Sequence, residues 1–193
     1  DDDKVSLTNL NRQIIATQKT IGRDKVEVMK ERMLEINPDT DVRIYKRFFL
    51  PENEDEFPFA EYDYIVDAVD TVTAKIALVM KAREKGIPVI SSMGAGNKLN
   101  ADMFRVSDIY QTNVCPLAKV MRRELKKRGV EKLKVVYSEE KPLKPQANSL
   151  LDTDIDQEHS QKRAIPGSIA FVPSVAGLII AGEVIKDLCE INT

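Results

Sequence analysis

Glycine is scarce in this chain: the 193 residues contain only 8, about half of the roughly 7% that is average in proteins. No G-x-G-x-x-G pattern and no Walker-type loop can be drawn from their positions, which are Gly22, Gly86, Gly94, Gly96, Gly129, Gly167, Gly177 and Gly182. Taken alone, the chain therefore offers no glycine-rich loop for the phosphates of a nucleotide.

Cysteine and histidine are scarcer still, with Cys115, Cys189 and His159 as the only members. Two distant cysteines exclude a disulfide framework and a multi-cysteine zinc site, and they favour reduced thiols and a cytoplasmic location. We expect Cys115 to be a small loop residue, Cys189 to pack in the last helix, and His159 to be exposed.

A strong charge excess and a long apolar run are also missing. The 29 basic and 31 acidic residues give a net charge of −2, so any nucleic-acid surface must be a local patch. Residues 164–182 carry no charge, but Pro166 and Pro173 interrupt them, which favours a turn and a buried core helix over a membrane span. Length and composition indicate one globular domain, residues 1–193.

Helical and strand-like patterns alternate along the first half of the chain. Apolar residues at helical spacing predict helices over 24–36 and 72–85, ended by Asn37-Pro38 and by Gly86. Strands are predicted at 42–45, 64–70 and 87–90, and an acidic helical turn at 51–57. This order predicts an α/β fold: a Rossmann-like, mostly parallel sheet with flanking helices.

The carboxyl ends of these predicted strands select the first site candidates. Ligands of parallel sheets bind beyond the carboxyl ends of the strands. Asp70 follows one apolar run and the loop Ser91–Gly96 follows the next, so we expect both at the same edge. Ser91 and Ser92 either cap the strand or contact a substrate.

The second half of the chain opens with a basic helix, predicted over 117–128. Leu117, Met121 and Leu125 form its apolar seam. Its cations are either a solvated face or a nucleic-acid surface, and they are Lys119, Arg122, Arg123, Lys126, Lys127 and Arg128.

The remaining segments are predicted as a strand, a long loop and a helix. A strand is predicted at 135–137, followed by a polar, flexible crossover loop at 139–163. The last helix is predicted over 174–188, and we expect it to pack through Val175, Leu178, Ile179, Ile185 and Leu188.

The most specific motif stands at the start of the chain, which reads D-D-D-K-V-S-L-T-N-L-N-R-Q. An acidic affinity tag would explain only its first four residues. Two carboxylates after a strand can hold ribose hydroxyls, and an asparagine, an arginine and a lysine can bracket a triphosphate. Lys25 follows Gln13 by twelve residues.

With these motifs, the sequence resembles the adenylation domain of the ubiquitin-activating-enzyme-like family, over nearly its whole length. The resemblance implies ATP and Mg²⁺ as cofactors and a sheet that continues into antiparallel strands. It implies that Asp1 and Asp3 bind the ATP ribose and that Asp70 binds Mg²⁺. The residues that it assigns to the phosphates are Asn9, Arg12, Gln13 and Lys25. Arg12, Lys25 and Asp70 would then be the catalytic residues.

Within the family, the sequence looks most like the branch that dehydrates threonylcarbamoyladenosine in tRNA. Sulfur-carrier adenylyltransferases resemble each other in paired C-x-x-C motifs and a crossover-loop cysteine, and this chain has neither. The resemblance implies that adenosine 37 of tRNA is the substrate and that the basic helix contacts the RNA. A carrier-protein adenylyltransferase and a non-catalytic RNA- or protein-binding module remain the alternatives.

The resemblance also bears on assembly and on the N-terminal part of the fold. It implies a homodimer whose ATP site borrows an arginine from the partner chain, and sulfur-transfer proteins are further possible partners. In the family, the glycine-rich loop lies before the position that matches Asp1. We therefore expect this chain to lack the N-terminal part of the adenylation fold and to bind ATP poorly by itself.

Overall fold

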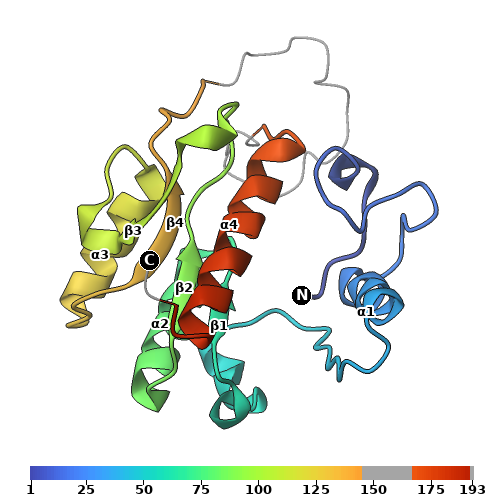
Figure 1. Cartoon of the computed structure of the whole chain (residues 1–193), viewed down its shortest axis with the longest axis horizontal. Coiled ribbons are helices and arrows are strands. Elements are labelled where there is room, and N and C mark those ends of the chain that lie inside the picture. The colour runs from blue at the N-terminus through green and yellow to red at the C-terminus, as the bar shows by residue number, and fades with distance from the viewer. Residues whose placement is uncertain (145–166, 192–193) are drawn as a thin grey trace.

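A computed structural model describes residues 1–144 and 167–191 (Figure 1). Four strands form one sheet in the order β1-β2-β4-β3, with bounds Ile65–Asp67, Val89–Ser92, Phe104–Asp108 and Lys134–Ser138 for β1 to β4. The pairs β1–β2 and β2–β4 are parallel, and β3–β4 is antiparallel. The prediction of a mostly parallel α/β sheet that continues into an antiparallel strand is therefore confirmed.

The described residues form four α-helices, of which the last three flank the sheet: α1 (Lys25–Ile36), α2 (Val72–Lys85), α3 (Pro116–Lys127) and α4 (Phe171–Leu188). Figure 1 shows α4 across one face of the sheet, α2 and α3 behind it, and α1 with the N-terminal segment set apart on the other side of α4. No helix in the described ranges is long and apolar enough to cross a membrane.

The helix boundaries follow from local chemistry. Helix α1 ends before Asn37-Pro38, because the residue before a proline leaves the helical region. Helix α2 ends at Gly86, which adopts the left-handed conformation (φ +70°) that glycine tolerates best. Helix α3 begins with Pro116, whose missing N–H costs nothing in a first turn.

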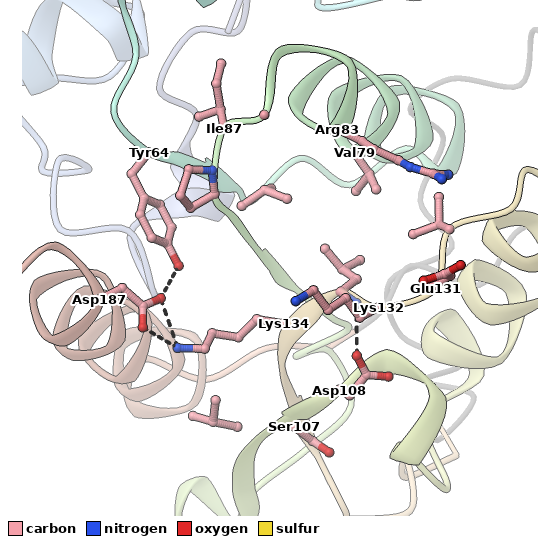
Figure 2. A pocket seen from close by; sticks show the side chains of 16 residues that line it. Tyr64, Val79, Arg83, Ile87, Ser107, Asp108, Glu131, Lys132, Lys134 and Asp187 are labelled. Atoms are coloured by element: carbon pink, nitrogen blue, oxygen red, sulfur yellow. Dashed lines mark hydrogen bonds and ion pairs between the residues drawn. The ribbon is translucent and has the colours of Figure 1, made fainter. Parts of the chain in front are cut away.

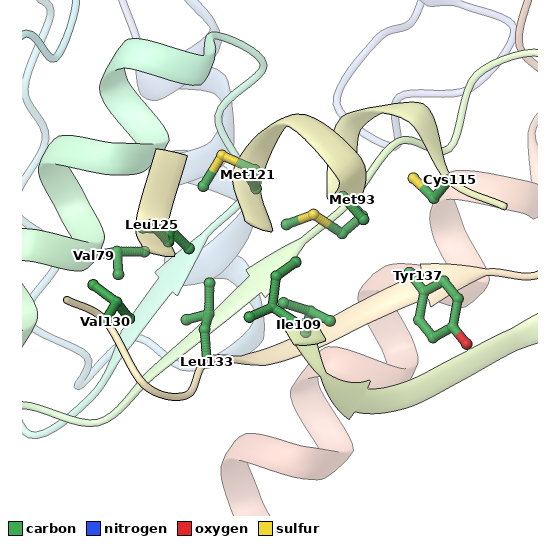
Figure 3. Close-up of a cluster of buried hydrophobic side chains, with 11 residues drawn as sticks. Val79, Met93, Ile109, Cys115, Met121, Leu125, Val130, Leu133 and Tyr137 are labelled. Carbon is green, nitrogen blue, oxygen red and sulfur yellow. The ribbon is translucent and has the colours of Figure 1, made fainter. Parts of the chain in front are cut away.

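The main core lies between the sheet and helices α2 and α3. Met121 and Leu125 of α3 are fully buried and point toward the strands, as the predicted seam requires (Figure 3). Cys115, expected to be a small loop residue, immediately precedes α3 and is buried in the same cluster. A second cluster joins α4 to the other face, through residues that include Ile90 and Val136.

Two strand predictions need correction. Residues 42–45 form no strand and pair with no described strand; the amino group of Asp1 donates to the Tyr45 carbonyl at 3.2 Å. The strand predicted at 64–70 is shorter, Ile65–Asp67, and its Val66 is 48% exposed. Helix α4 contacts β2 and β4 and leaves the corresponding face of β1 open. The sequence pattern also gave no sign of β3.

The packing expected for the last helix is wrong in part: Val175 and Ile179 pack against the second cluster as expected, and the other three residues do not. Helix α4 starts at Phe171, three residues early, and buries Val172, Ala176 and Ile180. Leu178, expected in the core, is 73% exposed, and Ile185 and Leu188 are exposed too. Cys189 caps the helix and is exposed rather than packed. Most of the crossover loop predicted at 139–163, from residue 145 onward and including His159, lies outside the described residues.

A buried leucine of α3, Leu125, and an exposed leucine of α4, Leu178, give a matched test of this packing. We expect Leu125→Ala to lower the free energy of unfolding by about 2–5 kcal/mol, because it opens a cavity in the main core. Leu178→Ala, at an exposed site, should change it by less than about 0.5 kcal/mol. Urea denaturation followed by circular dichroism measures both. Equal effects would contradict this packing.

Candidate functional site

The motif arginine lies at the carboxyl edge of the sheet. A cavity of about 210 Å³ is lined by Arg12, by the loop after β2 and by the residues before and in the first turn of α4: Ala95, Gly96, Gly167, Ser168 and Pro173. The Asn11 side chain donates a hydrogen bond to the Ser168 carbonyl at 2.9 Å, which joins the N-terminal segment to the start of α4. The edge chosen from strand order therefore carries a cavity with a cation.

Arg12 keeps donor capacity for a ligand. Its Nη1 donates to the Thr8 carbonyl and to Asn11 Oδ1, both at 3.0 Å. Among the described residues, the other N–H groups of its guanidinium have no hydrogen-bond partner. A guanidinium held on one side and open on the other suits a phosphate or carboxylate.

Asp3 and Lys25 form a second part of the site. Lys25 Nζ donates to Asp3 Oδ2 at 2.6 Å, and the Lys25 backbone N–H donates to the Asp3 carbonyl at 3.0 Å. Asp1 lies next to them, with its Oδ1 accepting from the Asp3 N–H at 2.9 Å. The structure thus brings together the residues that the resemblance assigns to the ribose and to a phosphate.

Asn9 ends the short turn Leu7–Asn9, and Gln13 follows it, with its backbone N–H donating to the Asn9 carbonyl at 3.0 Å. Asn9 is buried, and its Oδ1 accepts from the Ser6 N–H at 3.1 Å, so its oxygen holds the turn. Gln13 Oε1 is buried without a hydrogen-bond partner among the described residues. A buried acceptor without a partner is uncommon and calls for an explanation, such as a catalytic role or a bound water or ion.

Asp70 follows β1 and is exposed, as its predicted place at the sheet edge requires. No ion pair or hydrogen bond of its carboxylate occurs within the described part of the chain. The next residue, Thr71, carries the other buried side-chain oxygen that lacks a partner. In the ranges 1–144 and 167–191, no direct bond joins Asp70 to Arg12 or to Lys25, so the site consists of separate parts.

A buried charged network lies directly beneath Asp70, and the sequence pattern did not reveal it. Lys75 and Asp67 are 1% and 0% exposed, and Lys75 Nζ lies 3.1 Å from both carboxylate oxygens of Asp67. Burial lowers the pKa of Lys75, although the Asp67 carboxylate opposes this shift. Ser91 is buried and donates to Asp67 Oδ2, which favours the structural role weighed for it. A lysine on the apolar side of a helix was the available signal.

A second buried group holds the loop that follows the cavity. The Glu140 carboxylate accepts hydrogen bonds from the backbone N–H groups of Leu99 and Asn100 at 2.9–3.1 Å, and from Asn100 Nδ2. Burial alone would raise the pKa of Glu140, but these hydrogen bonds together hold it below its usual value. In the same loop, Asn97 bonds both to Leu143 and to Gly167.

The basic helix α3 presents most of its cations to solvent. Arg122 is the exception, because its Nη1 donates to the Thr112 carbonyl at 2.8 Å and so serves the fold. Glu124 pairs with Arg123, Lys127 and Arg128 at 3.0–3.1 Å, which lowers its pKa to about 2. Lys119 and Lys126 are also exposed. Five of the six predicted cations therefore lie on an accessible surface.

A larger cavity, about 780 Å³, lies at the opposite edge of the sheet (Figure 2). It opens at the amino ends of β2 and β4, and none of the motif residues lines it. On one side, the Tyr64 hydroxyl donates to Asp187 at 2.6 Å, and Lys134 bonds to the same carboxylate. Burial, with Asp187, raises the pKa of Tyr64. These polar groups satisfy each other, so we place the candidate site at the other edge.

Comparison with known proteins gives matches along the whole chain. The model of the ThiF family matches residues 1–193. A tRNA threonylcarbamoyladenosine dehydratase from Bacillus subtilis is 41% identical over 192 residues, which are 98% of this chain and 76% of that protein. Its Escherichia coli counterpart is 38% identical over 126 residues, 65% of this chain and 47% of the relative. The adenylyltransferase and sulfurtransferase UBA4 of Meyerozyma guilliermondii is 30% identical over 115 residues, 60% of this chain and 26% of that protein.

Solved structures show the same similarity in three dimensions. The crystal structure of E. coli tRNA N6-threonylcarbamoyladenosine dehydratase in complex with AMP superposes with a TM-score of 0.84 at 30% identity, covering 98% of this chain and 74% of that chain. The same enzyme in complex with ATP gives a TM-score of 0.78 at 28% identity, covering 99% and 76%.

Glu140 makes the stability of this edge dependent on pH. Since its pKa is depressed by folding, its contribution is complete above the unfolded value of about 4.3 and is lost as the pH falls through the folded value. We expect Glu140→Gln to lower the free energy of unfolding by about 1–3 kcal/mol at pH 7, because backbone N–H donors would then face the N–H₂ group of an amide. The difference in this free energy between wild type and variant should become smaller below about pH 4.

Urea denaturation between pH 7 and pH 3 measures this difference. The matched control is Glu139→Gln, because the neighbouring Glu139 is more exposed and pairs only with Arg105 and Tyr137. Its effect should be smaller at every pH. A Glu140→Gln effect that stays constant over the whole pH range would contradict the assignment.

Proposed function

The chain belongs to the ThiF family, and from this premise we propose that it activates a carboxylate with ATP by adenylation. The observation that carries the proposal is the cavity at the carboxyl edge, which Arg12 lines together with Gly96 and Gly167. Lys25, paired with Asp3, supplies a second cation in the same N-terminal segment.

In the proposed reaction, a carboxylate oxygen attacks the α-phosphorus of ATP, and the bond to the pyrophosphate oxygen breaks. Negative charge on the phosphate oxygens increases in the transition state, so cations contribute most of the catalysis. Arg12 offers a planar fork of donors, and Lys25 offers a compact charge that can leave Asp3 for a phosphate. A carboxylate is already ionised at pH 7 and needs no general base.

The residues after β1 fit a magnesium ion. Asp70 presents an exposed carboxylate with no ion pair among the described residues, whereas the neighbouring Asp67 is fully engaged by Lys75 and Ser91. Mg²⁺ commonly uses one or two protein carboxylates together with substrate phosphates. When bound, the metal would neutralise phosphate charge. Asp70 would hold it, and Asp67 would not.

We further propose that the carboxylate belongs to the threonylcarbamoyl group on adenosine 37 of a tRNA. The support is the 41% identity to a dehydratase across 98% of the chain, against the 60% of the chain that matches the sulfurtransferase-linked adenylyltransferase. The same substituent would then close on its acyl-adenylate and release AMP. An internal nucleophile removes the need for an enzyme thiol, in agreement with a buried Cys115 and a crossover segment without cysteine.

The exposed cations of α3 support contact with RNA. Neutralising several phosphates supplies the sequence-independent part of RNA affinity, and the shape of the folded RNA and an accessible loop base supply recognition. A tRNA substrate also places the proposed reaction in the cytoplasm.

A homodimer and sulfur-transfer partners complete the proposal. The homodimer is supported by the exposed apolar residues of α4, which include Phe171, Leu178 and Ile185 at seven-residue spacing. Residues seven apart lie on the same side of a helix, and an apolar stripe of this kind favours an interface. No feature of the described residues bears on the sulfur-transfer partners.

Arg12→Ala tests the adenylation step. In the full-length protein with ATP and threonylcarbamoyladenosine-modified tRNA, we expect pyrophosphate release to fall roughly 100- to 1,000-fold, as for the loss of one donor to a developing oxyanion. Arg23→Ala is the matched control, because Arg23 only pairs with Glu31 on the surface of the same segment. Full cyclisation by Arg12→Ala would favour the non-catalytic binding module.

The identity of the substrate is tested by supplying either modified tRNA or a carrier protein. Wild-type protein with ATP should release pyrophosphate when modified tRNA is added, and should not respond to a small carrier protein with a Gly-Gly tail. Release that depends on the carrier alone would overturn the tRNA proposal and leave adenylation intact.

Charge reversal on α3 tests the RNA surface. We expect a Lys126→Glu, Lys127→Glu, Arg128→Glu variant to bind tRNA more weakly and to lower the slope of log Kd against log salt by about 1 for each phosphate that is no longer neutralised. Glu124→Gln is the opposing control, because it frees three cations and should tighten binding. If the triple variant keeps the wild-type dependence of Kd on salt, these cations do not contact RNA and form only a solvated helix face.

A further inference from the structure

The buried network beneath Asp70 connects the two loops that the proposed reaction uses. Lys75 Nζ donates to both oxygens of Asp67, the last residue of β1, and at 2.7 Å to the carbonyl of Ser92, the last residue of β2. Ser91 Oγ donates to Asp67 and lies 3.5 Å from the ammonium group. One cation therefore holds together the carboxyl ends of two neighbouring strands.

Two hydrogen bonds fix the residues on both sides of Asp70. Asp67 Oδ1 accepts from the Val69 N–H at 3.3 Å, which ties the residue before Asp70 to the network. The backbone N–H of Lys75 donates to the Thr71 carbonyl at 3.0 Å, as part of the first turn of α2. The network thus positions the Asp70 backbone through Asp67 and Val69, although neither Asp67 nor Lys75 touches the Asp70 carboxylate.

On the other strand, the network fixes the start of the cavity loop. Ser92 is followed by Met93, which is buried and donates its N–H to the Val136 carbonyl at 2.8 Å. Ala95 and Gly96, which line the Arg12 cavity, come next. A shift of Ser92 would therefore move the wall that faces Arg12.

A stability role alone explains this arrangement poorly. Replacing a buried ion pair by apolar side chains of similar volume is often neutral or stabilising, because the desolvation of both charges offsets their attraction. A buried pair is better suited to fixing one geometry, since its partners allow few alternatives. Here the geometry that it fixes is the spacing between the Asp70 turn and the cavity loop.

We propose that Lys75, with Asp67 and Ser91, is a positioning residue that sets the place of the Asp70 carboxylate relative to the Arg12 cavity and thereby the affinity of the site for a nucleotide-bound divalent cation. This inference rests on the adenylation function proposed above. It adds a residue that contacts neither the nucleotide nor the metal.

The test measures metal binding without turnover. Mn²⁺ is titrated into the full-length protein with a non-hydrolysable ATP analogue, and water-proton relaxation reports Mn²⁺ held on the protein. We expect Lys75→Met to weaken Mn²⁺ binding roughly 10- to 100-fold, the order of loss that follows when a group that orients a metal ligand is removed. Lys75→Met leaves the Asp67 charge buried and alone, so a lower melting temperature is also expected.

A second variant separates position from stability. Lys75→Met combined with Asp67→Leu and Ser91→Ala removes every charge of the network, and we expect it to regain most of the lost melting temperature while Mn²⁺ binding stays weak. Lys81→Met is the matched control: Lys81 lies on the same helix and pairs with Glu54 and Asp55 at 3.0 Å, away from the site. It should lose stability and keep its Mn²⁺ affinity.

Three results would overturn the inference: wild-type affinity in Lys75→Met, affinity regained together with stability in the triple variant, or an equal loss of affinity in Lys81→Met. Failure of the proposed function gives a different result. If the wild-type protein itself holds no Mn²⁺ in the presence of the analogue, the adenylation proposal is wrong, and the inference that rests on it is withdrawn with it.

Discussion

The ammonium group of Lys75 has no contact with water, and the carboxyl edge of the sheet is arranged around it. Parallel strands are joined by hydrogen bonds along their length, but their last residues lead into loops that must be held in other ways. Here a side chain from α2 reaches between β1 and β2 and bonds to both. The ends of two strands and helix α2 are thus joined through one buried charge.

Much of the fold could be predicted because its boundaries are local. Gly86, the pair Asn37-Pro38 and the seam of α3 are properties of neighbouring residues, and the corresponding helices were found. The errors concern long-range contacts. In α4 nearly every residue is apolar, so periodicity could not tell which side faces the sheet. Residues 42–45 have a strand pattern but no described strand to pair with. Strand β3 forms through its antiparallel pairing with β4, which the pattern of its own residues does not indicate.

The candidate site divides in the same way. The motif at the start of the chain could be recognised because order and spacing survive in a linear sequence, and the structure pairs Asp3 with Lys25 and places Arg12 at the cavity. Lys75 and Glu140 could not be assigned, because their partners lie far away in sequence: Ser92 and Asp67 for one, and Leu99 and Asn100 for the other. A charged residue among apolar neighbours in the sequence indicates a buried long-range contact, but it does not identify the residue on the other side.

The three cations that gather around Glu124 have a thermodynamic consequence for any polyanion that meets α3. A free lysine or arginine side chain loses up to roughly 1.5–2 kcal/mol of rotamer entropy when it is immobilised. Arg123, Lys127 and Arg128 are already held in place by the Glu124 carboxylate. Part of the ordering thus precedes the encounter, and the incoming phosphates have to compete with one carboxylate instead of restraining three mobile chains.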